Sequence, residues 1–197
     1  MEFYEVIKNR RSIYAIDSTK TLPEDRIIEI VEYALLHTPS AFNSQTGRAV
    51  VLFGENHDRL WQIVSEELKK IVPDEKFPAT QEKLNGFAAG YGTILFFEDS
   101  AVVQSLVDRF PLYKDAFPAY SLQSSGMLQF IIWAAIEAEG LGASLQHYNP
   151  LIDDKVKREW NIPDSWSLIS QMPLGNPTAP AGEKEFLPID ERMKIFR

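Results

Sequence analysis

The stretch from Leu122 to Glu139 constrains the fold most strongly, because it predicts a helix that is apolar on nearly every side. The glycines of Gly140-Leu141-Gly142 end it. A helix of this kind must be buried all round. In a chain of 197 residues it is therefore the central helix of the core or part of a subunit interface. Its apolar residues are Met127, Leu128, Phe130, Ile131, Ile132, Trp133, Ala134, Ala135, Ile136 and Ala138.

Helical and strand-like patterns alternate along the rest of the chain. This alternation predicts a layered mixed fold of helices and strands. A length of 197 residues is enough for a sizeable core, and we expect a single domain over 1–197. We predict helices at 23–36, 79–89 and 153–160, and a further helix capped by Asn56. We predict strands at 48–53, 92–98, 143–147 and 165–172. From Pro173 the chain is a tail without a core pattern of its own.

A polar loop separates the helix at 23–36 from the strand at 48–53. It reads Pro39-Ser40-Ala41-Phe42-Asn43-Ser44-Gln45. Its two amides and two hydroxyls can offer donors and acceptors to the edge of a planar heterocycle. An ordinary turn is the alternative, because Pro, Ser and Asn are common in turns.

A second candidate site is Arg10-Arg11-Ser12, which follows a short amphipathic segment. Two guanidinium groups and a hydroxyl are suited to a phosphate. The chain has a net charge of −8 and no basic run, so an anion must bind locally and a nucleic-acid surface is not expected. The alternative is a solvated helix end, where cations interact well with the helix dipole.

Four motifs in this order resemble the nitroreductase family of FMN enzymes. They are Arg10-Arg11-Ser12, the Pro39–Gln45 loop, Gly-Tyr-Gly-Thr-Ile-Leu-Phe-Phe-Glu-Asp at 90–99 and Ser-Leu-Gln-His-Tyr-Asn at 144–149. The last two are similar to the subfamily named after fatty-acid-repression and copper-induced nitroreductases. The resemblance implies an α+β, nitroreductase-like fold with a central, mostly antiparallel mixed sheet flanked by helices. It also implies a homodimer in which each C-terminal tail is exchanged with the partner.

The resemblance also implies how FMN would be held. Arg10, Arg11 and Ser12 would meet the phosphate and the ring edge, and Lys184 in the tail would reach the phosphate. The loop would come from the other subunit. Gln146 and His147 match a strand whose backbone approaches the flavin nitrogen. The residues carried over in this way are Arg10, Arg11, Ser12, Pro39, Ser40, Asn43, Gln45, Gln146, His147 and Lys184.

Three positions near these motifs leave alternatives open. Phe186 stands where many members carry a second tail cation, and spacing does not show whether Arg192 replaces it. Tyr14 stands where several members carry a basic residue. Lys83 is a candidate for the carbonyl edge of the flavin, although a lone lysine on a helix is more often solvated.

The segment 109–120 is rich in aromatic residues and interrupted by proline. Together with Phe42, its Tyr113 and Phe117 are candidates for a substrate pocket that offers flat apolar surface. Simple packing is the alternative, because aromatic side chains are commonly recruited for burial.

The expected activity is that of an FMN-dependent NAD(P)H oxidoreductase, which reduces nitroaromatics or quinones by ping-pong hydride transfer. The flavin carries the chemistry, so no catalytic acid or base is assigned. A flavin-binding regulator without turnover would use the same residues. We expect no metal, because the chain has no Cys and its three His lack metal spacing. We expect a cytoplasmic protein, because no apolar run has the ~18 residues of a membrane helix.

Overall fold

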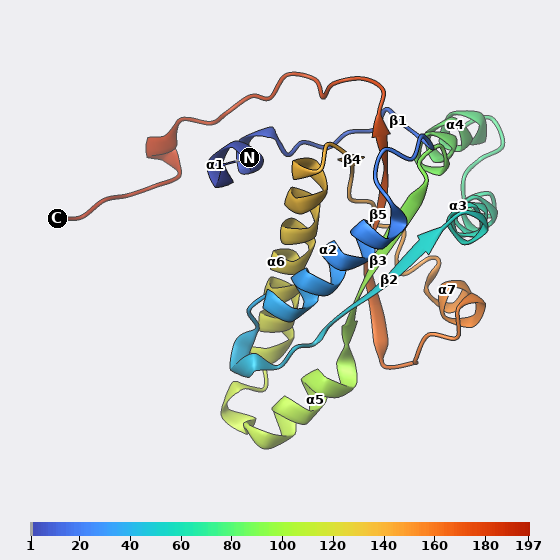
Figure 1. Ribbon diagram of the computed structural model, residues 1–197. Helices are drawn as coiled ribbons and strands as arrows, with labels where there is room; N and C mark the ends of the chain where they lie inside the picture. Colours follow the sequence, from blue (N-terminus) through green and yellow to red (C-terminus); the bar gives the residue numbers. More distant parts are fainter. Residues whose placement is uncertain (1) are drawn as a thin grey trace.

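A five-stranded sheet forms the centre of the computed structural model, which describes residues 2–197 (Figure 1). The strand order is β1-β5-β3-β2, and β4 pairs with β5 beside this path. All the pairings between these strands are antiparallel, and an isolated bridge from Ser12 to Ala143 is parallel. This confirms the predicted mostly antiparallel sheet. The strands are β1 Ile16–Asp17, β2 Gly47–Phe53, β3 Gly92–Asp99, β4 Gly142–Ala143 and β5 Trp166–Pro177.

Helices cover both faces of the sheet, as β3 requires because all its residues are buried. Ile94 and Phe96 face a core shared with α2 and α6, whereas Leu95 and Phe97 face a second core with α3, α4 and α7. Figure 1 shows these two groups of helices on opposite sides of the strands. The helices are α1 Phe3–Asn9, α2 Glu24–His37, α3 Glu55–Leu68, α4 Phe77–Ala88, α5 Ser100–Arg109, α6 Phe117–Ala138 and α7 Asp153–Glu159, with short 3₁₀ turns η1 Ala41–Asn43, η2 Pro111–Tyr113 and η3 Ile189–Glu191.

The long apolar helix is α6, and it begins five residues earlier than predicted, with Pro118 in its first turn. Ile132 and Ile136 are fully buried against the sheet and α2. Leu122, Met127 and Phe130 remain exposed on another side. The helix is therefore central to the core, as predicted, but a single chain does not bury it all round.

Two predicted strand boundaries were wrong, and Pro173 explains both. It lies inside β5, which continues to Pro177 instead of ending at Met172. Ser144 donates its N–H to the carbonyl oxygen of Pro173, at 3.4 Å, but proline has no N–H to return the bond. The predicted strand 143–147 is therefore reduced to β4 and an isolated bridge between Gln146 and Gln171.

The predicted cap at Asn56 was also wrong. The residue before α3 is Gly54, whose φ of 53° lies in the left-handed region where glycine carries no steric penalty. The side-chain oxygen of Asn56 instead accepts a hydrogen bond from the indole nitrogen of Trp160, at 2.9 Å. Asn56 thus connects α3 to the end of α7.

Candidate functional site

The end of α1 and the chain after β5 enclose a cavity of about 530 Å³, here called the basic pocket. Arg11 helps to close it, because its Nη2 donates to the carbonyl oxygen of Gly182 at 2.7 Å. The two residues are 171 positions apart in the sequence. The cavity brings together four of the residues that the sequence associates with a phosphate: Arg10, Arg11, Ser12 and Lys184.

Arg10 in this pocket has an unused hydrogen-bond donor. Its guanidinium carbon lies 4.2 Å from the centre of the Trp133 ring, and its Nε is buried with no acceptor among residues 2–197. Burial and the neighbouring Arg11 lower the pKa of Arg10, and Glu137 partly opposes them. A buried donor without a partner costs about 1–3 kcal/mol. An acceptor group that contacts this nitrogen would remove the cost.

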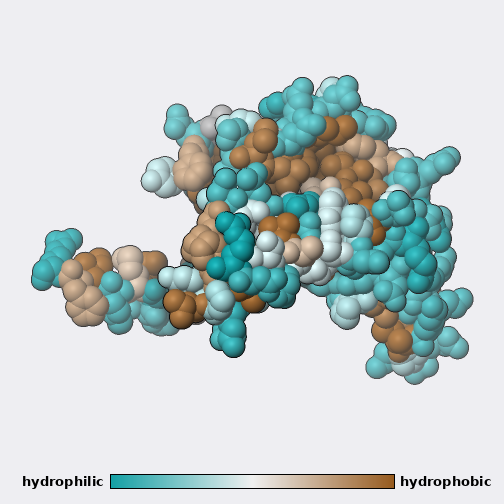
Figure 2. All heavy atoms as spheres, turned by 90° about the horizontal axis from the view of Figure 1, so that it is seen from below, coloured by the Kyte–Doolittle hydropathy of each residue, from teal (hydrophilic) through white to brown (hydrophobic). Residues whose placement is uncertain are grey.

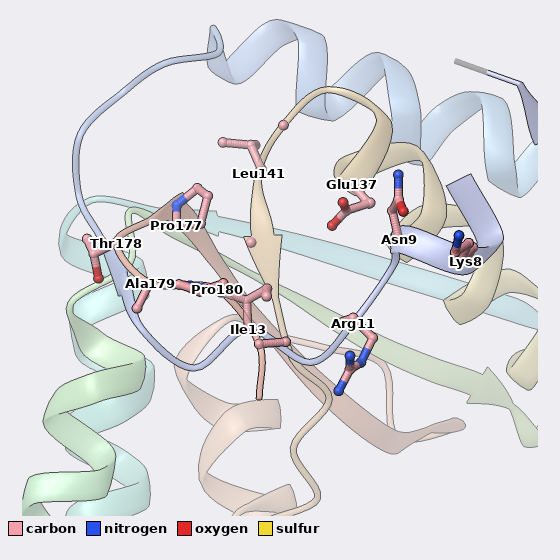
Figure 3. Close-up of a pocket in the computed structure, with 13 residues that line it drawn as sticks. Lys8, Asn9, Arg11, Ile13, Glu137, Leu141, Pro177, Thr178, Ala179 and Pro180 are labelled. Atoms are coloured by element: carbon pink, nitrogen blue, oxygen red, sulfur yellow. The ribbon is translucent and has the colours of Figure 1, made fainter. Parts of the chain in front are cut away.

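A second cavity, of about 610 Å³, lies on the other side of Arg11 (Figure 3). The ends of α1 and α6 and the chain from Pro177 to Ala181 line it. In Figure 3 the Arg11 side chain projects away from Glu137. Burial raises the pKa of the Glu137 carboxyl, while the charge of Arg10 lowers it. Arg11 therefore borders open space on both sides, whereas Arg10 is fixed against α6.

Phe186 and Lys184 form one unit in the tail. The Lys184 ammonium lies 5.1 Å from the centre of the Phe186 ring. Such a contact contributes about 0.5–1 kcal/mol at an exposed site. Phe186 stands where many family members have a second tail cation, and here its ring contacts the tail cation that this chain does have, Lys184. Arg192 lies farther along the exposed tail, after η3.

The Pro39–Gln45 loop has an unusual backbone. Phe42, Asn43 and Gln45 all have φ values between 50° and 57°, in the left-handed region. Such a conformation costs about 1–3 kcal/mol for a residue other than glycine and persists only where its surroundings hold it. Ser40 is one support, since its Oγ accepts from the backbone N–H of Gln45 at 2.9 Å. Backbone strain of this kind is concentrated at functional sites.

The same loop packs against the aromatic segment. The ring centre of Phe42 lies 4.9 Å from that of Phe110, 5.5 Å from Phe117 and 6.0 Å from Tyr113. Phe117 is only 1% exposed, whereas Phe42 is 56% and Tyr113 47% exposed. The structure thus brings the three predicted pocket residues together, with Phe117 as the buried inner wall and two accessible rings around it.

The basic pocket and the loop lie at different ends of α6 (Figure 1). Arg10 packs on Trp133, whereas the loop and Ser124 line one small cavity. Ser124 and Trp133 are separated by about two and a half turns, or roughly 14 Å of helix. One chain therefore does not bring its own loop to its own basic pocket.

The remaining predicted residues take separate positions. The backbone of Gln146 pairs with Gln171, and its side chain donates to Ser144 Oγ at 3.0 Å. His147, the next residue, is exposed. The Lys83 ammonium lies 5.7 Å from the centre of the Phe87 ring, which also packs against Tyr14 of the basic pocket. Lys83 is thus on the same side of the molecule as the basic pocket.

Glu98 is a buried polar residue beneath the Pro39–Gln45 loop. The sequence alone indicated no role for it. It is only 4% exposed, and the hydroxyl of Ser121 donates to its Oε2. Its Oε1 finds no donor in the described part of the chain. Burial raises the pKa of Glu98, while hydrogen bonds from Ser121 and Thr46 and the charge of Arg48 oppose this. The only signal in the sequence is an acidic residue at the end of an apolar strand.

This burial predicts a pH-dependent stability difference between the wild type and Glu98→Gln. Below the ordinary pKa of 4.5, the folded and unfolded states both bind the proton. Above it the unfolded chain releases the proton first, so the folded wild type loses stability until the pH passes its raised pKa. The stability of Glu98→Gln relative to wild type should therefore rise with pH from about 4.5 and then level off. Urea unfolding over a pH series measures this, with the exposed Glu82→Gln as control. A difference independent of pH would contradict it.

No group of three or more His, Cys, Asp or Glu in residues 2–197 is arranged to hold a metal ion. Within the same residues, no helix has the length and apolar character needed to cross a membrane.

Comparison with known proteins identifies the family. The model of the nitroreductase family matches residues 7–176. The chain belongs to the nitroreductase family. It is 34% identical to HBN1 of Saccharomyces cerevisiae over 196 residues, which cover 98% of this chain and 96% of HBN1. It is 33% identical to the nitroreductase FRM2 of the same yeast over 189 residues, or 94% of this chain and 93% of FRM2.

Solved structures confirm the nitroreductase-like fold. The nitroreductase CinD from Lactococcus lactis in complex with chloramphenicol superposes with a TM-score of 0.92 at 46% identity, over 100% of both chains. A nitroreductase structure from Exiguobacterium sibiricum that contains FMN has a TM-score of 0.75 at 17% identity, over 100% of this chain and 98% of that one. Family membership supports an oxidoreductase.

Proposed function

We propose that this nitroreductase-family protein uses FMN to transfer hydride from NAD(P)H to nitroaromatic or quinone acceptors. The observation that carries the proposal is the cavity in which Arg10, Arg11, Ser12 and Lys184 lie together, because it gathers three cations and a hydroxyl in one place. A phosphate would supply acceptors to all four. The structures of CinD in complex with 4-nitrophenol and nicotinic acid support aromatic and nicotinamide-like ligands.

The complete site is proposed to need two chains. The basic pocket of one subunit would hold the phosphate, and Ser40, Asn43 and Gln45 of the other would meet the ring edge. The separation of the two sets along α6 supports this arrangement. Further support comes from the exposed apolar side chains on α6 and the tail. Figure 2 shows apolar surface on the body of the molecule and on the tail that extends from it.

FMN, when bound, would supply the chemistry of hydride transfer between the nicotinamide and the acceptor. The protein's own residues bind and orient. Arg10, Arg11 and Lys184 would neutralise the phosphate, and the loop amides would match the donors and acceptors of the ring. The exposed Phe42 and Tyr113 rings would form a flat apolar wall for whichever aromatic substrate is present.

If the nicotinamide and the acceptor use this wall in turn, initial-rate plots should give parallel lines. Tyr113→Ala should then raise the KM for a quinone several-fold while FMN stays bound, because the phosphate contacts lie elsewhere. Leu112→Ala, at the neighbouring exposed residue, is the matched control. Phe117→Ala is less informative, because losing a buried Phe costs about 3–5 kcal/mol of stability.

Intersecting initial-rate lines would show that the nicotinamide and the acceptor do not bind in turn at one position. Unchanged acceptor kinetics in Tyr113→Ala would return the aromatic segment to a packing role. Turnover with NADH and a quinone also separates this enzyme from a flavin-binding regulator, which would bind FMN without turning over.

A further inference from the structure

Arg48, the second residue of β2, holds the chain just after the loop. Its Nη1 donates to the carbonyl oxygens of Gln45, at 2.6 Å, and Gly47, at 3.0 Å. Its Nη2 donates to Oδ2 of Asp99, also at 3.0 Å. The guanidinium carbon lies 5.7 Å from the centre of the Trp166 ring, which limits its movement on one side. One side chain thus fixes two backbone carbonyls on either side of Thr46.

Asp99 connects this arrangement to the aromatic segment. Its backbone N–H donates to the carbonyl oxygen of Thr46 at 2.9 Å, and its Oδ1 accepts from the N–H of Ala101 at 3.1 Å. The second contact caps α5, which ends directly before Phe110. Phe110 in turn packs on Phe42 in the loop. The loop is therefore held at its middle, Phe42, by aromatic rings and at its end by Arg48 and Asp99.

The loop requires such support because three of its residues are in the left-handed region. The φ of Gln45 is 50°, and Arg48 binds the carbonyl of that same residue. A solvent-exposed ion pair would contribute little. Arg48 and Asp99 differ from such a pair because both are partly buried and because Arg48 also binds backbone carbonyls. Removing Arg48 would take this support away from the carbonyl of Gln45.

We propose that Arg48 is a positioning residue, which acts with Asp99 as a clamp that holds the Pro39–Gln45 loop in its flavin-binding conformation. The proposal rests on the proposed function, because it requires this loop to contact FMN. The clamp does not touch the cofactor. It sets the direction in which Asn43 and Gln45 present their amides.

The test uses Arg48→Met, which keeps the length of the side chain and removes its donors, and Asp99→Asn. An asparagine at 99 has only one acceptor oxygen, and when that oxygen caps α5 the NH₂ group lies toward Arg48 and cannot accept its hydrogen bond. The full-length apo-proteins are titrated with FMN, and their thermal midpoints are measured without flavin. The control is Arg59→Met, because Arg59 is also a partly buried arginine in ion pairs, with Glu66 and Glu159, but lies on α3.

Arg48→Met should weaken FMN binding by about 10- to 100-fold, as expected for lost charge-assisted hydrogen bonds, and Asp99→Asn should weaken it by about 10-fold. The double variant should match Arg48→Met, because both changes break one unit. The absorption maximum of the flavin that still binds should shift toward that of FMN in water. Arg59→Met should leave both the affinity and the spectrum unchanged.

Unchanged FMN affinity and spectrum in Arg48→Met, even with a lowered thermal midpoint, would overturn the proposal and leave Arg48 a structural role only. If Arg48→Met does not fold, Asp99→Asn decides on the same criteria. A wild-type protein that binds no FMN would instead refute the proposed function, so the two failures can be distinguished.

Discussion

Replacing Arg11 by Ala is expected to weaken FMN binding about 10- to 150-fold. The change removes charge-assisted hydrogen bonds of about 1.5–3 kcal/mol from the basic pocket. It also removes the contact that holds Gly182 over that pocket. Fluorescence titration of the apo-protein with FMN measures the effect. The matched control is Arg158→Ala, since Arg158 is exposed on α7 away from the pocket.

Arg10→Ala should have an effect of similar size, accompanied by a loss of stability. Arg10 packs on Trp133, so its removal also exposes an indole ring that its guanidinium now covers. Arg11 has no such ring contact among the residues described, and its substitution reports on the ligand more directly. An FMN affinity unchanged in Arg11→Ala would remove Arg11 from the site and shift the phosphate grip to Arg10 and Lys184.

Deleting residues 185–197 is expected to abolish a stable, flavin-loaded dimer. In a single chain these residues leave six large apolar side chains exposed. An obligate interface commonly buries more than ~2,000 Å² and leaves no stable monomer. Light scattering should report a dimer for the full chain and monomer or aggregate for the truncated one, with FMN affinity reduced at least tenfold. The apolar side chains removed are Phe186, Leu187, Ile189, Met193, Ile195 and Phe196.

A double substitution in the same segment provides the control. Asp190→Asn with Glu191→Gln keeps the apolar side chains and changes only two exposed charges. This variant should remain a dimer with bound flavin. A truncated protein that is still a flavin-loaded dimer, or a full chain that is a folded monomer with FMN at low concentration, would contradict tail exchange.

The sequence predicted the layered fold because its strongest elements are decided by local patterns. The β-branched and aromatic residues of β3 are all buried, and the apolar run of α6 supplies Leu128, Ile132 and Ile136 to one of the two cores. Pro173 was misread as the start of the tail because proline usually ends a strand. Its position opposite Ser144 depends on a pairing that no local pattern reveals.

The candidate site was predicted from its motifs only in part. Motif order identified the residues of the basic pocket and the loop, and the structure places four of them in one cavity. The left-handed backbone of Phe42 could not be foreseen, because a phenylalanine rarely adopts it. The contact between Arg48 and Asp99 was equally hidden, because it joins side chains 51 positions apart whose strands pair only in the folded sheet.

The flavin content of the purified protein decides whether the basic pocket holds FMN. The full-length protein is purified, its visible spectrum is recorded, and the flavin released by heating is identified by chromatography. We expect a yellow protein that releases stoichiometric FMN, held without a covalent bond in the basic pocket. Release of FAD, or a colourless protein that takes up no flavin after incubation with FMN, would contradict it.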